Sequence, residues 1–251
     1  MVLTLTRPDG TPITTWEEWS RPKLDYHWKE GRSAMELAKS WFRNDALSPP
    51  QELSSLLHSH PRTNQIELTE GIPELVTPLP ERGNGRNHDL ALRGSTEHES
   101  VILCIEAKAD ESFGNATVGE YWLSGIQKRN RGTSTRVPER VEALLAMVDP
   151  VHAIESSPWK NIRYQLLTAH CGTILQAKKD NATLAVFVVH EFHTNETSPE
   201  KQTANHKELK RFLTVISNGG HDADLQAGKL YGPFNYDGID CLIGKVITKM
   251  V

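Results

Sequence analysis

One strand-sized run constrains the fold more than any other feature of the chain. Residues 101–105 are apolar at every position, so an extended chain would present apolar side chains on both of its faces. A strand of that kind is normally interior to a sheet whose two faces are both covered. Glu106 and Lys108 follow at once, and period-two alternation places both on one face. The sequence therefore predicts charged side chains at the end of a buried strand.

The flanking segments predict alternating strands and helices. Residues 88–93 and 101–108 are expected to form a hairpin, and residues 183–192, 229–234 and 240–248 further strands. Helical spacing covers residues 118–127, 206–216, a segment from Pro138 to before Pro150, and residues 161–178, with two more helices from Ser33 and at 51–58. Residues 65–79 are expected to be extended but broken by Gly71, Pro73 and Pro78. We expect one α/β domain over residues 1–251, with an irregular N-terminal arm of about residues 1–32 packed on the body through Trp16, Trp19 and Trp28.

Composition narrows the class of protein. The net charge of −4 argues against coating nucleic acid by bulk attraction, although a local basic strip would suffice for a nuclease. No apolar run approaches the roughly 20 residues of a membrane helix, and the first residues lack a secretory pattern. Three widely spaced cysteines, Cys104, Cys171 and Cys241, are expected to be reduced, with Cys104 and Cys241 buried. We expect a cytoplasmic protein with no membrane partner.

An acidic pair stands out beside the buried strand. If the hairpin pairs normally, Asp89 approaches Glu106 from the neighbouring strand. Two close carboxylates repel each other, and a divalent cation relieves that repulsion; Mg²⁺ favours one or two carboxylates, waters and a substrate phosphate. The alternative is an ordinary salt bridge between Glu106 and Lys108 at a sheet edge.

These residues resemble the active site of the PD-(D/E)xK nuclease-like (restriction-endonuclease-like) superfamily, with Asp89 on one strand and Glu106-Ala107-Lys108 ending the next. His88 stands where the family pattern has Pro. The resemblance implies a central mixed β-sheet flanked by helices. It also implies a metal, Mg²⁺ or Mn²⁺, held by Asp89, Glu106 and the main-chain carbonyl of Ala107. Lys108 would then orient or activate the attacking water.

The resemblance extends to supporting residues. Residues 106–114 read Glu-Ala-Lys-x-x-Glu-x-Phe-Gly and look like a group of uncharacterised bacterial proteins of this superfamily, although Glu111 also suits a local loop role. Many members carry an acidic residue on the first helix, here Glu36, for which the alternative is a capping box with Ser33. Several branches place a glutamine on the helix before the last core strand, here Gln165, for which a surface position is the alternative.

A basic run and two histidines complete the candidates. Residues 128–136 contain no acidic side chain and could contact phosphates, or could form a solvated loop. The candidate contacts are Lys128, Arg129, Arg131 and Arg136. His190 and His193 are too closely spaced for a helical zinc motif, and a strand would point them to opposite faces.

Together these features predict a metal-dependent phosphodiester hydrolase, a nuclease acting on DNA. A homodimer is compatible with such an enzyme, because cutting both strands often uses two copies of a site. The alternative is a non-catalytic protein of the same fold that binds nucleic acid or a protein partner.

Overall fold

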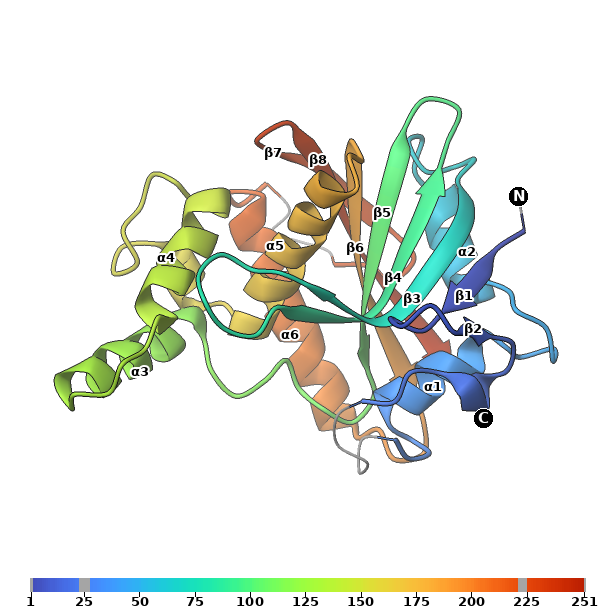
Figure 1. Ribbon diagram of the computed structural model, residues 1–251, viewed down its shortest axis with the longest axis horizontal. Helices are drawn as coiled ribbons and strands as arrows, with labels where there is room; N and C mark the ends of the chain where they lie inside the picture. Colours follow the sequence, from blue (N-terminus) through green and yellow to red (C-terminus); the bar gives the residue numbers. More distant parts are fainter. Residues whose placement is uncertain (1, 23–27, 221–224, 251) are drawn as a thin grey trace.

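The computed structural model describes residues 2–22, 28–220 and 225–250. In this part of the chain eight strands form one sheet in the order β2-β1-β3-β4-β5-β6-β8-β7 (Figure 1). The strands are β1 (Thr4–Thr6), β2 (Pro12–Ile13), β3 (Glu67–Thr77), β4 (Arg86–Ser95), β5 (Ser100–Lys108), β6 (Leu184–His193), β7 (Leu230–Tyr236) and β8 (Ile239–Lys249). The longer helices are α1 (Ser33–Ser40), α2 (Gln51–His58), α3 (Val118–Asn130), α4 (Val137–Val148), α5 (Tyr164–Lys179) and α6 (Pro199–Ile216).

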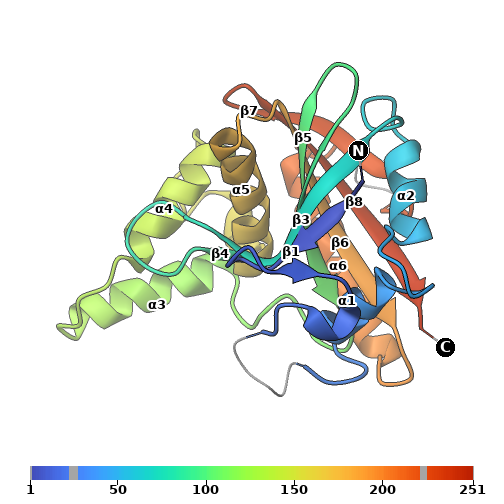
Figure 2. The same cartoon turned by 45° about the vertical axis from the view of Figure 1, so that its right-hand side comes forward.

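The sheet is mixed. Strands β3, β4 and β5 form an antiparallel meander, and β5, β6 and β8 are parallel to one another. Figures 1 and 2 show helices on both sides of it, with α1 and α2 on one face and α3 to α6 on the other. The expected class, an α/β fold with a central mixed sheet flanked by helices, is confirmed.

Strand β5 lies between β4 and β6 and is buried from Val101 to Lys108, as its apolar run predicts. Its side chains alternate between two cores. Leu103 and Ile105 pack with α1 and α2, whereas Ile102 and Cys104 pack with the helices of the opposite face. All three cysteines are free and buried. The apolar alternation thus fixes which face receives the charged pair that ends β5.

The N-terminal arm is more regular than expected. Strand β1 pairs in parallel with β3 and in antiparallel fashion with β2, so the arm extends the sheet. Trp19 is 2% exposed and belongs to the core on the α1 and α2 face, and Trp16 and Trp28 pack against that core. Residues 23–27 of the arm lie outside the described residues.

Two expectations about boundaries were wrong. Strand β3 is continuous, because position 71 requires a glycine and position 73 tolerates a proline. A Cβ on Gly71 would meet Leu5 and Leu92 at 2.4 and 2.7 Å, and Pro73 lies beyond the residues that β1 pairs with. Helix α6 begins at Pro199, well before the expected residue 206. Its N-terminus is capped by the Ser198 hydroxyl, which accepts a hydrogen bond from Lys201 N–H.

The helices α3 and α4 form an excursion between β5 and α5. Its two ends are joined by main-chain hydrogen bonds, from Val118 N–H to Ile162 C=O (2.8 Å) and from Tyr164 N–H to Ala116 C=O (3.0 Å). The first turns of α3 and α5 are therefore held side by side. Within the described residues, no helix is long and apolar enough to cross a membrane.

Candidate active site

Asp89 and Glu106 come from neighbouring antiparallel strands. The β4–β5 ladder ends at the pair Leu90 and Ile105, so Asp89 and Glu106 each lie one residue beyond its end. Asp89 Oδ2 accepts a hydrogen bond from Ala107 N–H at 2.6 Å. The three residues therefore lie at one point of the sheet, as their spacing in the sequence predicts.

Glu106 is 1% exposed and is surrounded by donors. Its Oε1 accepts hydrogen bonds from Lys108 Nζ at 2.6 Å and from Gln165 Nε2 at 2.7 Å. Its Oε2 forms an ion pair with the guanidinium of Arg86. Burial of an ionised carboxylate without partners would cost several kcal/mol, and these contacts offset that cost.

Arg86 was not singled out from the sequence, and a local irregularity explains why. The ladder between β3 and β4 skips the pair Glu74 and Asp89, and Glu74 has a left-handed backbone with φ 59°. Leu90 belongs to the core on the α1 and α2 face, yet His88 lies against Gly172 of α5 on the opposite face. The alternation of β4 therefore changes at Asp89, although the register between β3 and β4 is the same on both sides of it.

His88, which replaces the family's Pro, is part of the same region. It is 1% exposed, and burial lowers the pKa of its imidazole to about 3. Its Nε2 lies 3.1 Å from Thr77 Oγ1, and the Thr77 hydroxyl donates to Gln176 of α5 at 2.7 Å. Because the single Thr77 proton is used in that bond, His88 Nε2–H must be the donor to Thr77. His88 thus ties the start of β4 to α5.

A cavity of about 670 Å³ opens over these residues. The arm and α1 form one side, the loop between β3 and β4 a second, and α3, α4 and α5 a third. Arg140 of α4 donates to the carbonyls of Asn84 (2.6 Å) and Glu81 (3.0 Å) and so holds the loop in place. The polar and aromatic lining includes Glu74, Arg86, Asn87, Asp89, Glu106, Lys108, Glu111, Tyr121, Arg140, Tyr164, Gln165 and Thr168.

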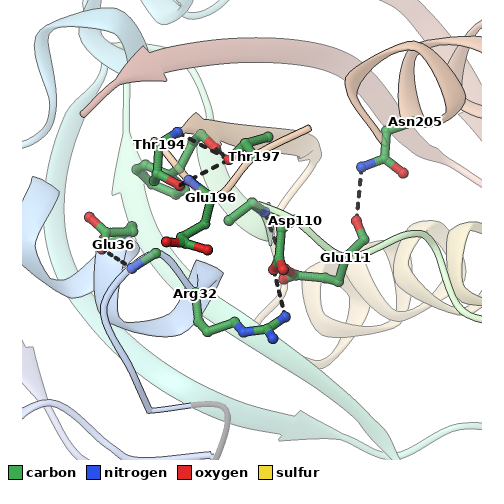
Figure 3. Close-up of polar contacts among 11 residues, drawn as sticks. Arg32, Glu36, Asp110, Glu111, Thr194, Glu196, Thr197 and Asn205 are labelled. Atoms are coloured by element: carbon green, nitrogen blue, oxygen red, sulfur yellow. Dashed lines mark hydrogen bonds and ion pairs between the residues drawn. The ribbon is translucent and has the colours of Figure 1, made fainter. Parts of the chain in front are cut away.

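Glu36 lies outside this cavity. Its Oε1 accepts a hydrogen bond from Gly31 N–H at 2.8 Å, and it lines a separate hollow with Arg32 and Glu196 (Figure 3). The capping box expected with Ser33 is also absent, since Arg32 is the N-cap residue of α1 and no side chain caps it. Glu111, in contrast, lines the cavity, and its main-chain carbonyl accepts a hydrogen bond from Asn205 of α6 at 2.9 Å (Figure 3).

The basic run is also remote from the cavity. Lys128, Arg129, Arg131 and Arg136 lie at the end of α3 and in the turn to α4, at the outer tip of the molecule (Figure 1). Arg129 and Arg136 both pair with Glu139 of α4, which reduces the positive charge that they offer. Of the residues that the structure describes, Arg86, Lys108 and Arg140 are the cations that line the cavity.

The charges of the cavity leave an excess of carboxylate. Among the described lining residues, the four carboxylates of Glu74, Asp89, Glu106 and Glu111 and the three cations give a formal net charge of −1. Burial holds the pKa of Lys108 below its ordinary value, while nearby Asp89 and Glu111 oppose that shift.

The donor set suits a magnesium-like cation. Asp89, Glu106 and Ala107 all line the cavity, and Mg²⁺ is commonly bound by one or two carboxylates with waters. Among the described residues, no cluster of three or more His, Cys, Asp or Glu side chains is arranged to hold a metal. Glu106 Oε2 would become available only if the Arg86 guanidinium moved aside. The residues therefore fit a divalent cation in competition with Arg86.

A second buried ion pair lies on the next two strands of the sheet, β6 and β8, and was also missed. Lys245 Nζ of β8 contacts Glu191 Oε2 of β6 at 2.8 Å, and His193 Nε2 lies 3.1 Å from the same oxygen. His190 faces the other side of β6 and contacts Thr248 at 2.9 Å, so the two histidines diverge as expected. Glu191 and Lys245 do not line the cavity.

The comparisons with known proteins give one match. Residues 12–250 match the model of DUF6946, described as a domain of unknown function, and this match covers nearly the whole chain. No curated protein and no solved structure matches it. The chain belongs to the DUF6946 family.

Proposed function

We propose that the protein is a metal-dependent phosphodiester hydrolase, a nuclease acting on DNA. The observation that carries the proposal is the convergence of Asp89, Glu106 and Lys108 from two adjacent strands at one cavity. Gln165, from the helix before β6, donates to Glu106 at 2.7 Å. This arrangement supports the resemblance to the PD-(D/E)xK superfamily.

The net charge of the cavity supports a requirement for a cation. A phosphodiester carries a negative charge, and a lining with a net charge of −1 repels it. A divalent cation, Mg²⁺ or Mn²⁺, would reverse the sign of the local charge. Asp89, Glu106 and the Ala107 carbonyl would hold the ion, which when bound polarises the scissile phosphate and makes its water more acidic.

The residues of the chain would then act by position. Lys108 would orient the attacking water toward phosphorus, and Gln165 would fix the carboxylate plane of Glu106. The water oxygen forms a bond to phosphorus as the bond from phosphorus to the leaving sugar oxygen breaks. The proton lost by the water passes to solvent, and the leaving oxygen takes up a proton from solvent.

Calorimetry tests the proposal directly. Mg²⁺ and Mn²⁺ would be titrated into the wild type and into an Asp89→Ala, Glu106→Ala double variant, with and without DNA. Cleavage of a mixed DNA substrate would be followed in parallel. A Glu97→Ala, Glu155→Ala double variant is the control, because it removes the same charge at exposed positions. We expect binding and cleavage in the wild type and in the control only; absence of metal binding in the wild type, even with DNA, would overturn the proposal.

One observation favours the alternative of a non-catalytic protein that binds nucleic acid or a protein partner. Glu106 already contacts two cations, Lys108 and Arg86, so its charge is compensated without a metal. The same titration separates the two functions, because a binding protein would retain DNA affinity without metal. The three free cysteines support a cytoplasmic location in either case.

A further inference from the structure

Two aromatic side chains line the cavity beside its charged residues Asp89, Glu106 and Lys108. Tyr121 of α3 and Tyr164 of α5 line it and stack on each other, with ring centroids 4.1 Å apart and an interplanar angle of 26°. The hydrogen bonds that join the first turns of α3 and α5 fix this pair. Two stacked rings held by main-chain contacts form a rigid surface.

The two rings differ in their availability. Burial raises the pKa of Tyr164. Tyr121 is half-buried, lies in the first turn of α3 and lines the cavity. The face of Tyr121 that does not contact Tyr164 is therefore the one that a planar ligand group could stack on.

The size of the cavity limits which molecules can reach Asp89, Glu106 and Lys108. Pockets of roughly 300–1,000 Å³ enclose molecules of drug size, which is the size of one or two nucleotides. At about 670 Å³, bounded by the arm on one side and by the β3–β4 loop and the α3–α4 excursion on the others, this cavity admits a nucleotide but not both strands of a duplex. Arg140 prevents the loop from moving away freely, because it bonds two of its carbonyls.

We propose that the site takes single-stranded nucleic acid, with one base stacked on Tyr121 while the adjacent phosphodiester lies over Asp89 and Glu106. This inference rests on the proposed function, which supplies the reason for DNA to enter the cavity. Stacking on an aromatic face is tolerant of base identity, because every base has a π-face. The substrate class is thus a single strand, a frayed end or an overhang, recognised without sequence specificity at this position.

Anisotropy with labelled DNA tests the assignment. All proteins would carry Asp89→Asn, which prevents cleavage. The parent with Asp89→Asn alone, and the same protein with Tyr121→Ala or Tyr121→Phe added, would each be titrated into labelled DNA. Two DNAs would be used, a single strand and the same strand within a blunt hairpin duplex. Loss of one base–aromatic stack is expected to weaken single-strand binding by about 5- to 100-fold in Tyr121→Ala. Tyr121→Phe keeps the ring and should stay within about twofold of the parent. Leu123→Ala is the matched control, since Leu123 is 48% exposed on the same helix and does not line the cavity.

The outcomes separate this inference from the proposed function. Equal affinity for the single strand and the duplex, or unchanged single-strand binding in Tyr121→Ala, would overturn the inference. Equal cleavage of both substrates by the wild type would also overturn it, but would be consistent with the proposed nuclease function. Conversely, a single-strand preference that depends on Tyr121, without any cleavage in Mg²⁺ or Mn²⁺, would overturn the proposed hydrolase function but not this inference. Should Tyr121→Ala fold poorly by circular dichroism, Tyr121→Leu, which keeps a larger apolar side chain than alanine but no π-face, decides the matter by the same criterion.

Discussion

The guanidinium of Arg86 is ion-paired with Glu106 Oε2, on the side of the carboxylate opposite to Lys108. Arg86 is nearly buried, with a side chain 10% exposed, and its Nε has no hydrogen-bond partner among the described residues. A cation thus stands where a metal would meet Glu106, and its own hydrogen bonding is incomplete. Arginine and metal should compete for one oxygen.

The first prediction follows from that competition. Arg86→Gln should increase Mn²⁺ affinity by about tenfold or more, because two unit charges about 4 Å apart interact by up to about 4 kcal/mol near a protein surface. Calorimetry gives the change in Kd. Arg82→Gln, in the same loop region but exposed, is the control. Unchanged or weaker binding in Arg86→Gln would show that Arg86 positions Glu106 and does not exclude the metal.

Gln165 supplies a second prediction. Gln165→Leu removes the 2.7 Å hydrogen bond to Glu106 Oε1 and should lower kcat for DNA cleavage by about tenfold, with KM almost unchanged, since one hydrogen bond to a charged group contributes about 1.5–3 kcal/mol. Steady-state kinetics separates the two constants. The exposed Gln127→Leu should behave as the wild type. A rise in KM alone would assign Gln165 to substrate binding.

The buried histidines predict a steep loss of stability in acid. Burial lowers the pKa of His88, His170 and His190 to about 3, from 6.5 when exposed. The unfolded chain therefore takes up protons below pH 6.5 that the folded protein excludes, so stability falls as the pH falls from 6.5 toward 3. Each histidine contributes about 1.4 kcal/mol per pH unit, and the three together about 6 kcal/mol at pH 5.

Urea unfolding at pH 7.5, 6 and 5 measures this effect. His170→Leu should reduce the pH dependence by about a third, because one of three equivalent groups is removed. His98→Leu should not, as His98 has a side chain 81% exposed. An unaltered slope in His170→Leu would mean that carboxylates dominate the acid transition.

The pair Glu191 and Lys245 predicts a purely structural effect. Lys245→Met leaves Glu191 buried without its lysine partner and should cost about 3–5 kcal/mol in the free energy of unfolding. Adding Glu191→Leu should recover most of that loss, because no buried charge remains. Lys249→Met, on the exposed end of β8, serves as the control. Chemical denaturation provides the values, and a double variant as unstable as the single one would contradict this account.

Much of the fold could be predicted because local patterns and global structure agree. The run 101–105 required an interior strand, and the strand indeed has a covered sheet face on each side. Glu106 and Lys108 share a face because β5 is regular up to its last residue. Pro138 and Pro150 likewise set the bounds of α4 to within a few residues.

The parts that could not be predicted depend on irregular backbone or on distant contacts. Period-two alternation places Arg86 with Leu90, but the unpaired position at Glu74 and Asp89 reverses the faces and brings Arg86 to Glu106. Arg140 is identified only once α4 lies against the β3–β4 loop, more than fifty residues away in sequence. Glu36 has suitable spacing and chemistry, yet the path of the preceding chain gives its carboxylate Gly31 N–H as a partner.

The α3–α4 excursion, closed at its base by two main-chain hydrogen bonds, has a consequence for how such a protein can diversify. Val141 and Leu144 of α4 belong to the core and resist change, whereas Tyr121 in the first turn of α3 lines the cavity. Asp89, Glu106 and Lys108 are carried by the sheet. Related proteins could therefore change their substrate by substitutions in the α3–α4 excursion, while Asp89, Glu106 and Lys108 on the strands stay the same.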